Sequence, residues 1–178
     1  IVHRDKTLQE CDMKAVVALA FGVPAELRSN KCVAEVASLQ SEALGGAPIF
    51  TQLGMEMHYG LPTKPIEGEH PGHWANTMQM ATAAVAWAKK EGICELWIAA
   101  ATPHLRRTLR DFQDEVRRQD VTIELRECPQ HMEFSSADWF CADSEQSRTR
   151  TRLVWYAWDI PLMLMPLSLY RRLTDFPL

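Results

Sequence analysis

A histidine and an arginine three residues apart are the side chains of this sequence best suited to binding or transferring a charged group. His104 and Arg107 lie in the stretch TPHLRR, residues 102–107. An imidazole exchanges protons near neutral pH, and a guanidinium offers a fork of donors to phosphate or carboxylate. Side chains three residues apart share one face of a helix. The pair therefore indicates one wall of a site for an anion.

The residues around this pair predict that it follows a buried strand and lies in the first turn of a helix. Residues 93–101 form an apolar run of strand length. Thr102 is predicted to be the N-cap and Pro103 the first helical residue, because a hydroxyl accepts an unpaired backbone N–H and proline lacks one. A helix N-terminus also favours an anion. Apolar residues then recur at helical spacing up to Gln119: Leu105, Leu109, Phe112 and Val116.

Alternating strand and helix patterns predict the scaffold that positions the pair. Strands are expected at 14–21, 48–53, 93–101 and 121–126, and helices at 29–44, 74–91 and 103–119. This alternation is typical of an α/β fold, a three-layer Rossmann-like sandwich with a mainly parallel sheet and helices on both faces. The polar–apolar alternation of the last strand suggests a sheet edge. Ligands bind at the carboxyl ends of such strands, where the turns after Phe21, Leu53 and Ala101 should converge.

The C-terminal part, residues 128–178, is predicted to be a helical extension on a core formed by residues 14–127, within one domain spanning 1–178. The run from Leu153 to Tyr170 is very apolar, but one acidic residue and two prolines interrupt it. A membrane span needs about 20 mostly apolar residues, so no span is expected. The segment is predicted to pack on the domain or on a second copy, giving a homodimer. Contact with a membrane surface is the alternative.

Composition excludes several classes of protein. The 178 residues are 47% hydrophobic, enough for a sizeable core, and the net charge of −4 disfavours a nucleic-acid-binding surface. The five cysteines are scattered and contain no CxxC pair, so neither a disulfide framework nor a structural zinc site is expected, and a cytoplasmic location is favoured. Dinucleotide-binding GxGxxG, Walker and GxSxG motifs are absent from the sequence.

A polar segment, residues 54–73, offers a different chemistry. It contains His58, His70 and His73 together with three glutamates, and imidazole and carboxylate groups bind zinc, manganese or iron. The spacing matches no known motif of the HExxH type, so a divalent metal is not expected as a cofactor. A loop metal site built on these histidines is kept as a third hypothesis beside the two that concern an anionic ligand.

Four short motifs follow one another between residues 14 and 172. The strand AVVALAFG ends at Gly22, and the strand IFTQLG carries Thr51 where related proteins have the serine of Ser-Gly-Gly. Glu69, with Glu67 as the rival position, precedes the Asn76-Thr77 pair that opens a helix. The last motif ends in His104 and Arg107. This order resembles the bacterial domain-of-unknown-function family that includes SanA, ElyC and YdcF, and the chain is most similar to the soluble YdcF type.

The resemblance implies a Rossmann-like fold and a set of functional residues. Ligand binding would fall to Gly22, Thr51, Asn76, Thr77, Thr102 and Arg107. His104 would transfer a proton, with Glu69 orienting it or acting as its partner acid or base. One family member is reported to bind S-adenosylmethionine, and others are linked to the cell envelope. The sequence departs from the family pattern where Gln52 and Leu53 replace glycines and alanines replace two hydroxyl residues.

Two functions remain open from these observations. The first is an enzyme, a transferase or hydrolase, that performs group transfer or phosphoester cleavage on a small anionic, nucleotide-like ligand such as S-adenosylmethionine or a phosphorylated compound. The second is a non-catalytic binding or regulatory module, linked to envelope metabolism, in which the same residues hold the ligand.

Overall fold

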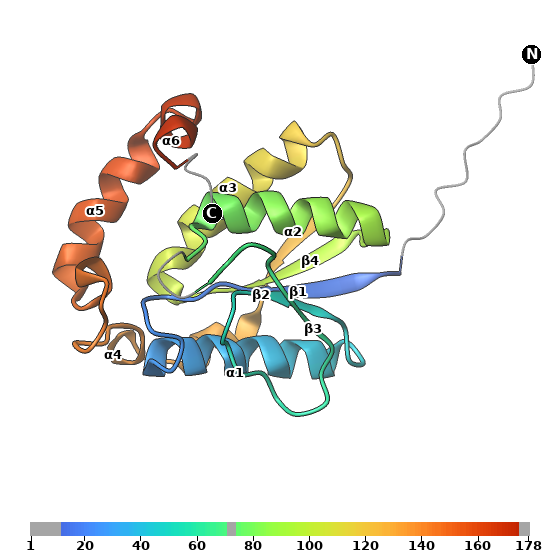
Figure 1. The fold of residues 1–178 in the computed structure, drawn as a ribbon, viewed down its shortest axis with the longest axis horizontal. Helices are drawn as coiled ribbons and strands as arrows, with labels where there is room; N and C mark the ends of the chain where they lie inside the picture. Colours follow the sequence, from blue (N-terminus) through green and yellow to red (C-terminus); the bar gives the residue numbers. More distant parts are fainter. Residues whose placement is uncertain (1–11, 71–73, 175–178) are drawn as a thin grey trace, which may run out of the picture.

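The computed structural model describes residues 12–70 and 74–174. A five-stranded, all-parallel sheet with the strand order β3-β2-β1-β4-β5 forms its centre. Helices α2 and α3 cover one face of the sheet and α1 covers the other (Figure 1). The predicted three-layer Rossmann-like α/β sandwich is thus confirmed. The strands are β1 (Lys14–Ala18), β2 (Ile49–Thr51), β3 (Thr63–Pro65), β4 (Glu95–Ala99) and β5 (Glu124–Glu127).

The helices alternate with these strands and then continue into a C-terminal segment. The longer ones are α1 (Arg28–Ala43), α2 (Thr77–Glu91), α3 (Thr102–Arg118), α5 (Arg152–Leu164) and α6 (Leu167–Thr174). Shorter turns are η1 (Pro129–Glu133), α4 (Ser136–Trp139) and η2 (Ser147–Thr149).

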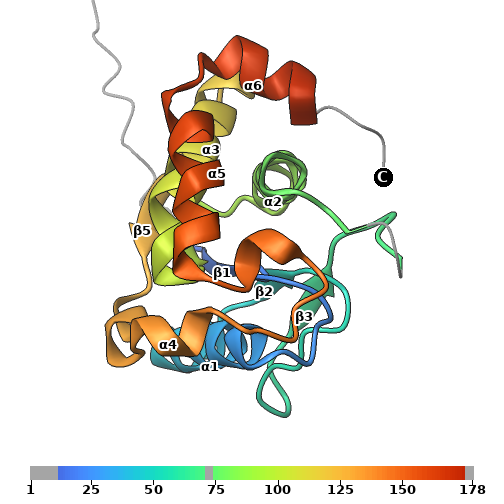
Figure 2. The same ribbon diagram turned by 90° about the vertical axis from the view of Figure 1, so that its left-hand side faces the viewer.

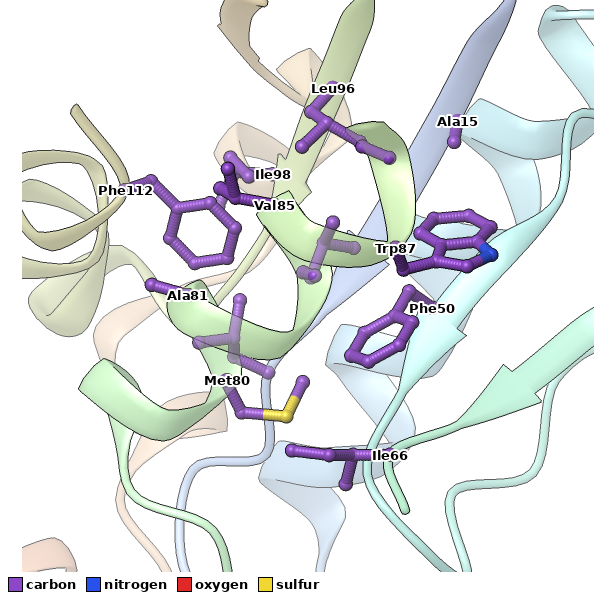
Figure 3. Close-up of a cluster of buried hydrophobic side chains, with 14 of the residues drawn as sticks. Ala15, Phe50, Ile66, Met80, Ala81, Val85, Trp87, Leu96, Ile98 and Phe112 are labelled. Carbon is purple, nitrogen blue, oxygen red and sulfur yellow. The ribbon is translucent and has the colours of Figure 1, made fainter. Parts of the chain in front are cut away.

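Two apolar cores flank the sheet because neighbouring side chains of a strand point to opposite faces. In β1, Ala15 and Val17 belong to the core beneath α2 and α3, whereas Val16 and Ala18 belong to the core beneath α1. Figure 3 shows the first core, in which Phe50 of β2 lies beside Trp87 of α2. Their ring centroids are 5.3 Å apart. Burial on both faces explains the continuous apolar run of β1 in the sequence.

The sequence prediction missed β3. Residues 54–73 were expected to be loop, but Thr63–Pro65 pairs with β2 at one edge of the sheet. Three residues with partly exposed side chains give no periodic signal, and Pro65 is tolerated because an edge strand needs fewer ladder hydrogen bonds. The strand expected at 121–126 is β5, Glu124–Glu127, and it does form the opposite edge.

The start of α1 also differs from the prediction. The helix begins at Arg28, one residue before the predicted start, and Leu27 is its N-cap. The buried side chains of Ser29 and Asn30 hold the turn after β1. The Asn30 amide accepts the Phe21 N–H at 2.6 Å and donates to the Gly22 carbonyl at 3.1 Å, and the Ser29 hydroxyl donates to the Phe21 carbonyl at 2.8 Å. These contacts fix the backbone that later forms part of the candidate site.

The C-terminal segment lies across the carboxyl ends of the strands. Figures 1 and 2 show α5 at this end of the sheet, beside α3. Arg110 of α3 donates to the Leu162 and Met163 carbonyls at the end of α5, at 2.9 and 3.0 Å. Arg171 of α6 pairs with Asp114 of α3 at 2.6 Å. No helix within residues 12–70 and 74–174 is both long enough and apolar enough to cross a membrane.

Cys94 forms a disulfide bond, whereas Cys32, Cys128 and Cys141 are free thiols. One disulfide is not a framework, so the fold does not depend on cysteine pairing as small secreted domains do. The bond nevertheless removes the support that cysteine usage gave to a cytoplasmic location.

Glu115 anchors the contact between α3 and α6. Its buried carboxylate accepts hydrogen bonds from Arg118 at 2.5 Å, from Gln119 at 2.6 Å and from Arg171 at 2.8 Å. Burial alone would raise the pKa of Glu115, but these hydrogen bonds outweigh burial and lower the pKa from 4.5 to about 2. The carboxylate therefore stays ionised in the folded protein well into the acidic range.

This lowered pKa predicts acid sensitivity. A carboxylate with a depressed pKa stabilises the fold above its unfolded pKa, and its contribution is lost as the pH falls from 4.5 toward 2. We expect Glu115 to account for a loss of about 3 kcal/mol in the free energy of unfolding across that window. Urea denaturation at several pH values should show a shallower pH dependence for Glu115→Gln. An identical pH dependence in both proteins would contradict this assignment.

Candidate functional site

A pocket of about 250 Å³ opens at the carboxyl edge of the sheet. The turns after β1 and β2 and the first turn of α3, which follows β4, all reach it, contributing Gly22, Leu53 and His104 among others. The C-terminal helices form the remaining wall through Trp155 and Tyr170. The three turns that the sequence predicted to converge therefore do line one pocket, in the position where open α/β sheets bind ligands.

His104 is buried at the base of this pocket. Its Nε2 lies 2.9 Å from the Thr77 hydroxyl, and its Nδ1 is enclosed without a hydrogen-bond partner among the described residues. Burial lowers the pKa of His104 well below 6.5, and the nearby charges of Arg107 and Arg148 lower it further. The imidazole is therefore neutral at neutral pH. The edge of the ring packs against Trp155, with ring centroids 5.4 Å apart.

Arg107 lines the pocket but already has an anionic partner. Its Nε donates to Asp159 at 2.6 Å, and its Nη1 donates to the Tyr170 hydroxyl at 3.0 Å. That hydroxyl in turn donates to Asp111 at 2.9 Å. Only Nη2 has no hydrogen-bond partner within the described part of the chain. Arg107 thus ties α5 and α6 to α3, and a ligand can use at most the remaining edge of its guanidinium.

Three further predicted ligand-binding residues line the pocket, each with a structural contact of its own. Asn76 is the N-cap of α2, where its side chain accepts the Gln79 N–H, and its amide donates to the Thr174 carbonyl at 2.9 Å. Thr77 is the hydrogen-bond partner of His104. The absent side chain of Gly22 lets the segment 144–149 approach, since a Cβ there would lie 2.8 Å from the Ser144 hydroxyl.

The structure does not bring Thr51 or Thr102 into the pocket lining. Thr51 is buried in β2, with its hydroxyl directed to the Gln52 carbonyl at 3.4 Å. Thr102 is exposed and is the first residue of α3, so the predicted N-cap is wrong by one position and Ala101 caps the helix without a side-chain hydrogen bond. Pro103 is the second residue of α3 and not the first, so the predicted start of the helix is one residue too late.

Glu69 is placed behind the pocket, where it joins three backbone segments. Its carboxylate accepts the Leu53 N–H at 2.5 Å, the Ala75 N–H at 2.8 Å and the Gln52 amide at 3.0 Å. Gln52 extends the network by accepting the Ala20 N–H at 2.8 Å. Glu69 does not line the pocket, so these contacts assign it a positioning role, and its action as an acid or base stays a prediction. The rival, Glu67, is exposed and pairs with Lys64 at 3.3 Å.

Arg148 is a pocket residue that the sequence did not single out. It enters the pocket from η2, and no hydrogen bond or ion pair to it occurs among residues 12–70 and 74–174. Surrounding atoms and the charge of Arg107 lower the pKa of Arg148. In the sequence it is one of three alternating arginines, Arg148, Arg150 and Arg152, which predict only a basic helix start.

Among the described residues, the loop histidines form no metal site. Both ring nitrogens of His58 are used by α1, with Nε2 2.8 Å from Glu35 and Nδ1 2.8 Å from Glu42. These hydrogen bonds, the one to Glu42 first, raise the pKa of His58. The described ranges contain no group of three or more potential ligands arranged to hold a metal ion. His73 lies outside those ranges.

Comparison with known proteins adds no assignment to this geometry. The chain matches no protein-family model, no curated protein and no solved structure.

Proposed function

We propose that this protein binds a small anionic, nucleotide-like ligand in the pocket at the carboxyl edge of its sheet. The observation that carries the proposal is the charge of the lining. Two guanidinium groups, those of Arg107 and Arg148, reach the pocket, and no aspartate or glutamate is among the described lining residues. The N-terminus of α2, formed by Asn76 and Thr77, opens onto the same space and adds a favourable dipole for an anion.

Aromatic side chains support a ligand with a flat ring. Trp74, Trp155 and Trp158 all line the pocket, and Trp158 is 60% exposed. Indole rings pack favourably on planar aromatic groups, either stacked face to face or in an edge-to-face arrangement. A pocket with cations and aromatic walls therefore suits a ligand that combines a negative charge with a planar base.

The geometry favours binding over catalysis. Proton transfer requires a group with a pKa near the working pH, within hydrogen-bonding reach of the ligand. His104 is buried, is held by Thr77 and has a pKa shifted well below its ordinary value. Glu69, its expected partner, is bound to backbone amides outside the lining. A non-catalytic binding module is accordingly the function we propose.

Tryptophan fluorescence gives a direct test, because half of the six tryptophans line the pocket. Titration with adenosine 5′-monophosphate should give a saturable change that weakens with added salt, since the charges involved are partly exposed. Adenosine, which lacks the phosphate, should bind at least tenfold more weakly. No saturable response to adenosine monophosphate or to inorganic phosphate would overturn the proposal.

A second copy of the chain is the proposed partner for the outer surface of α5. Its exposed apolar side chains include Leu153, Ile160 and Leu164, and the one acidic residue of the helix, Asp159, is buried. An exposed apolar surface of this kind, with Arg152 at the start of the helix as its one exposed charge, is typical of self-association. Sedimentation should show a concentration-dependent dimer that Leu153→Glu with Leu164→Glu abolishes. A monomer at every concentration would exclude it.

A further inference from the structure

The two pocket arginines differ in how their charges are balanced. Arg107 is paired with Asp159 at 2.6 Å, so its charge is largely compensated within the protein. Arg148 has no such partner in the described chain, although it is the more exposed of the two. Arg148 lines the same pocket as the cationic Arg107, and no described residue supplies a counterion to it. An incoming anion would stabilise this arrangement.

The same charge balance distinguishes between the two ligand classes that the sequence left open. S-adenosylmethionine carries a sulfonium and an ammonium group against one carboxylate. Bringing these cations beside Arg107 and Arg148 would be repulsive, and no carboxylate among the described lining residues offsets it. A phosphate group carries up to two negative charges and accepts bidentate hydrogen bonds from a guanidinium. The lining therefore discriminates in favour of a phosphorylated compound.

The size of the pocket limits the rest of the ligand. Its volume of about 250 Å³ lies below the range of roughly 300–1,000 Å³ that is usual for sites binding drug-sized molecules. A dinucleotide would extend well beyond it, whereas a mononucleotide or a smaller phosphate ester would place its phosphate inside and its ring at the mouth, where Trp158 is exposed.

We propose that Arg148 is the residue that binds the phosphate group of a phosphomonoester no larger than a mononucleotide, and that S-adenosylmethionine is not the ligand. This inference rests on the proposed function. It deepens that function by transferring the anion-binding role from the sequence-predicted Arg107 to a residue of the C-terminal segment. The segment 144–149 thereby becomes part of the site as well as a support for it.

The test compares three variants with the unchanged protein by isothermal titration calorimetry. The probes are adenosine 5′-monophosphate, inorganic phosphate and S-adenosylmethionine. Arg148→Gln should weaken binding of the first two by at least tenfold, and Arg148→Lys should retain part of the affinity, because an ammonium keeps the charge but loses the fork. Arg152→Gln is the matched control, since Arg152 is exposed and lies outside the pocket lining. It should stay within twofold.

The outcomes separate this inference from the function on which it rests. Saturable binding of the phosphates with no effect of Arg148→Gln would overturn the role of Arg148 but leave an anion-binding pocket. Tighter binding of S-adenosylmethionine than of adenosine monophosphate would overturn the ligand class. Equal losses in the Arg148 and Arg152 variants would show general surface attraction and contradict the inference. Absence of binding by every probe would remove the proposed function and the inference together.

Discussion

Replacing Asp159 by alanine is expected to lower the free energy of unfolding by about 3–5 kcal/mol, the usual cost of removing one partner of a buried ion pair. Asp159 and Arg107 are both nearly buried, with side chains 11% and 8% exposed, and their atoms are 2.6 Å apart. The substitution leaves the guanidinium with the Tyr170 hydroxyl as its remaining partner. Urea denaturation followed by circular dichroism measures the loss.

Asp143→Ala provides the matched control. Asp143 is an exposed aspartate of the same C-terminal segment and has no ion pair with any described residue. Its replacement should change stability by less than about 0.5 kcal/mol. A cost below about 1 kcal/mol for Asp159→Ala would mean that the pair is screened like a surface salt bridge. Arg107 would then be free to act as a ligand-binding residue, against the assignment made here.

Gly22→Ala is expected to destabilise the protein by about 2–5 kcal/mol, from backbone strain of about 1–2 kcal/mol together with overpacking of about 1–3 kcal/mol. Gly22 has a φ of +103°, which L residues rarely adopt, and an added Cβ would lie 2.9 Å from both Leu27 and the Thr149 hydroxyl. The segment that carries Arg148 would be displaced as well, so the affinity for phosphate should fall in the same variant.

Gly60→Ala isolates the strain from the packing. Gly60 has a φ of +85° but no described atom within 4 Å of its added Cβ, so this substitution should cost only about 1–2 kcal/mol. The difference between the two variants measures the contact of Gly22 with the C-terminal segment. Equal costs would show that the segment tolerates the methyl group, and that Gly22 does not set its position.

The sequence was sufficient to place the turn that carries His104 and Arg107. An apolar run, a proline and a helical repeat follow one another over residues 93–119, and each signal is local. Local signals also revealed the edge position of β5. In contrast, β3 is too short and too exposed to produce a pattern, and its existence depends on pairing with β2.

The partners of the functional residues could not be predicted for a different reason. Arg107 and Asp159 are 52 positions apart in the sequence. No local spacing pattern could therefore indicate that the predicted anion-binding arginine is already paired with a carboxylate. Glu69 shows the same limitation, since its role depends on backbone amides of Leu53 and Ala75. Arg148 stands among similar arginines, and only the tertiary fold shows that it enters the pocket.

A crystal structure of the protein grown with adenosine 5′-monophosphate tests the central claim most directly. The account predicts the phosphate inside the pocket at the carboxyl edge of the sheet, within hydrogen-bonding distance of the Arg148 guanidinium, with the base near Trp158. Nucleotide bound at another surface, or an empty pocket at saturating ligand, would contradict it.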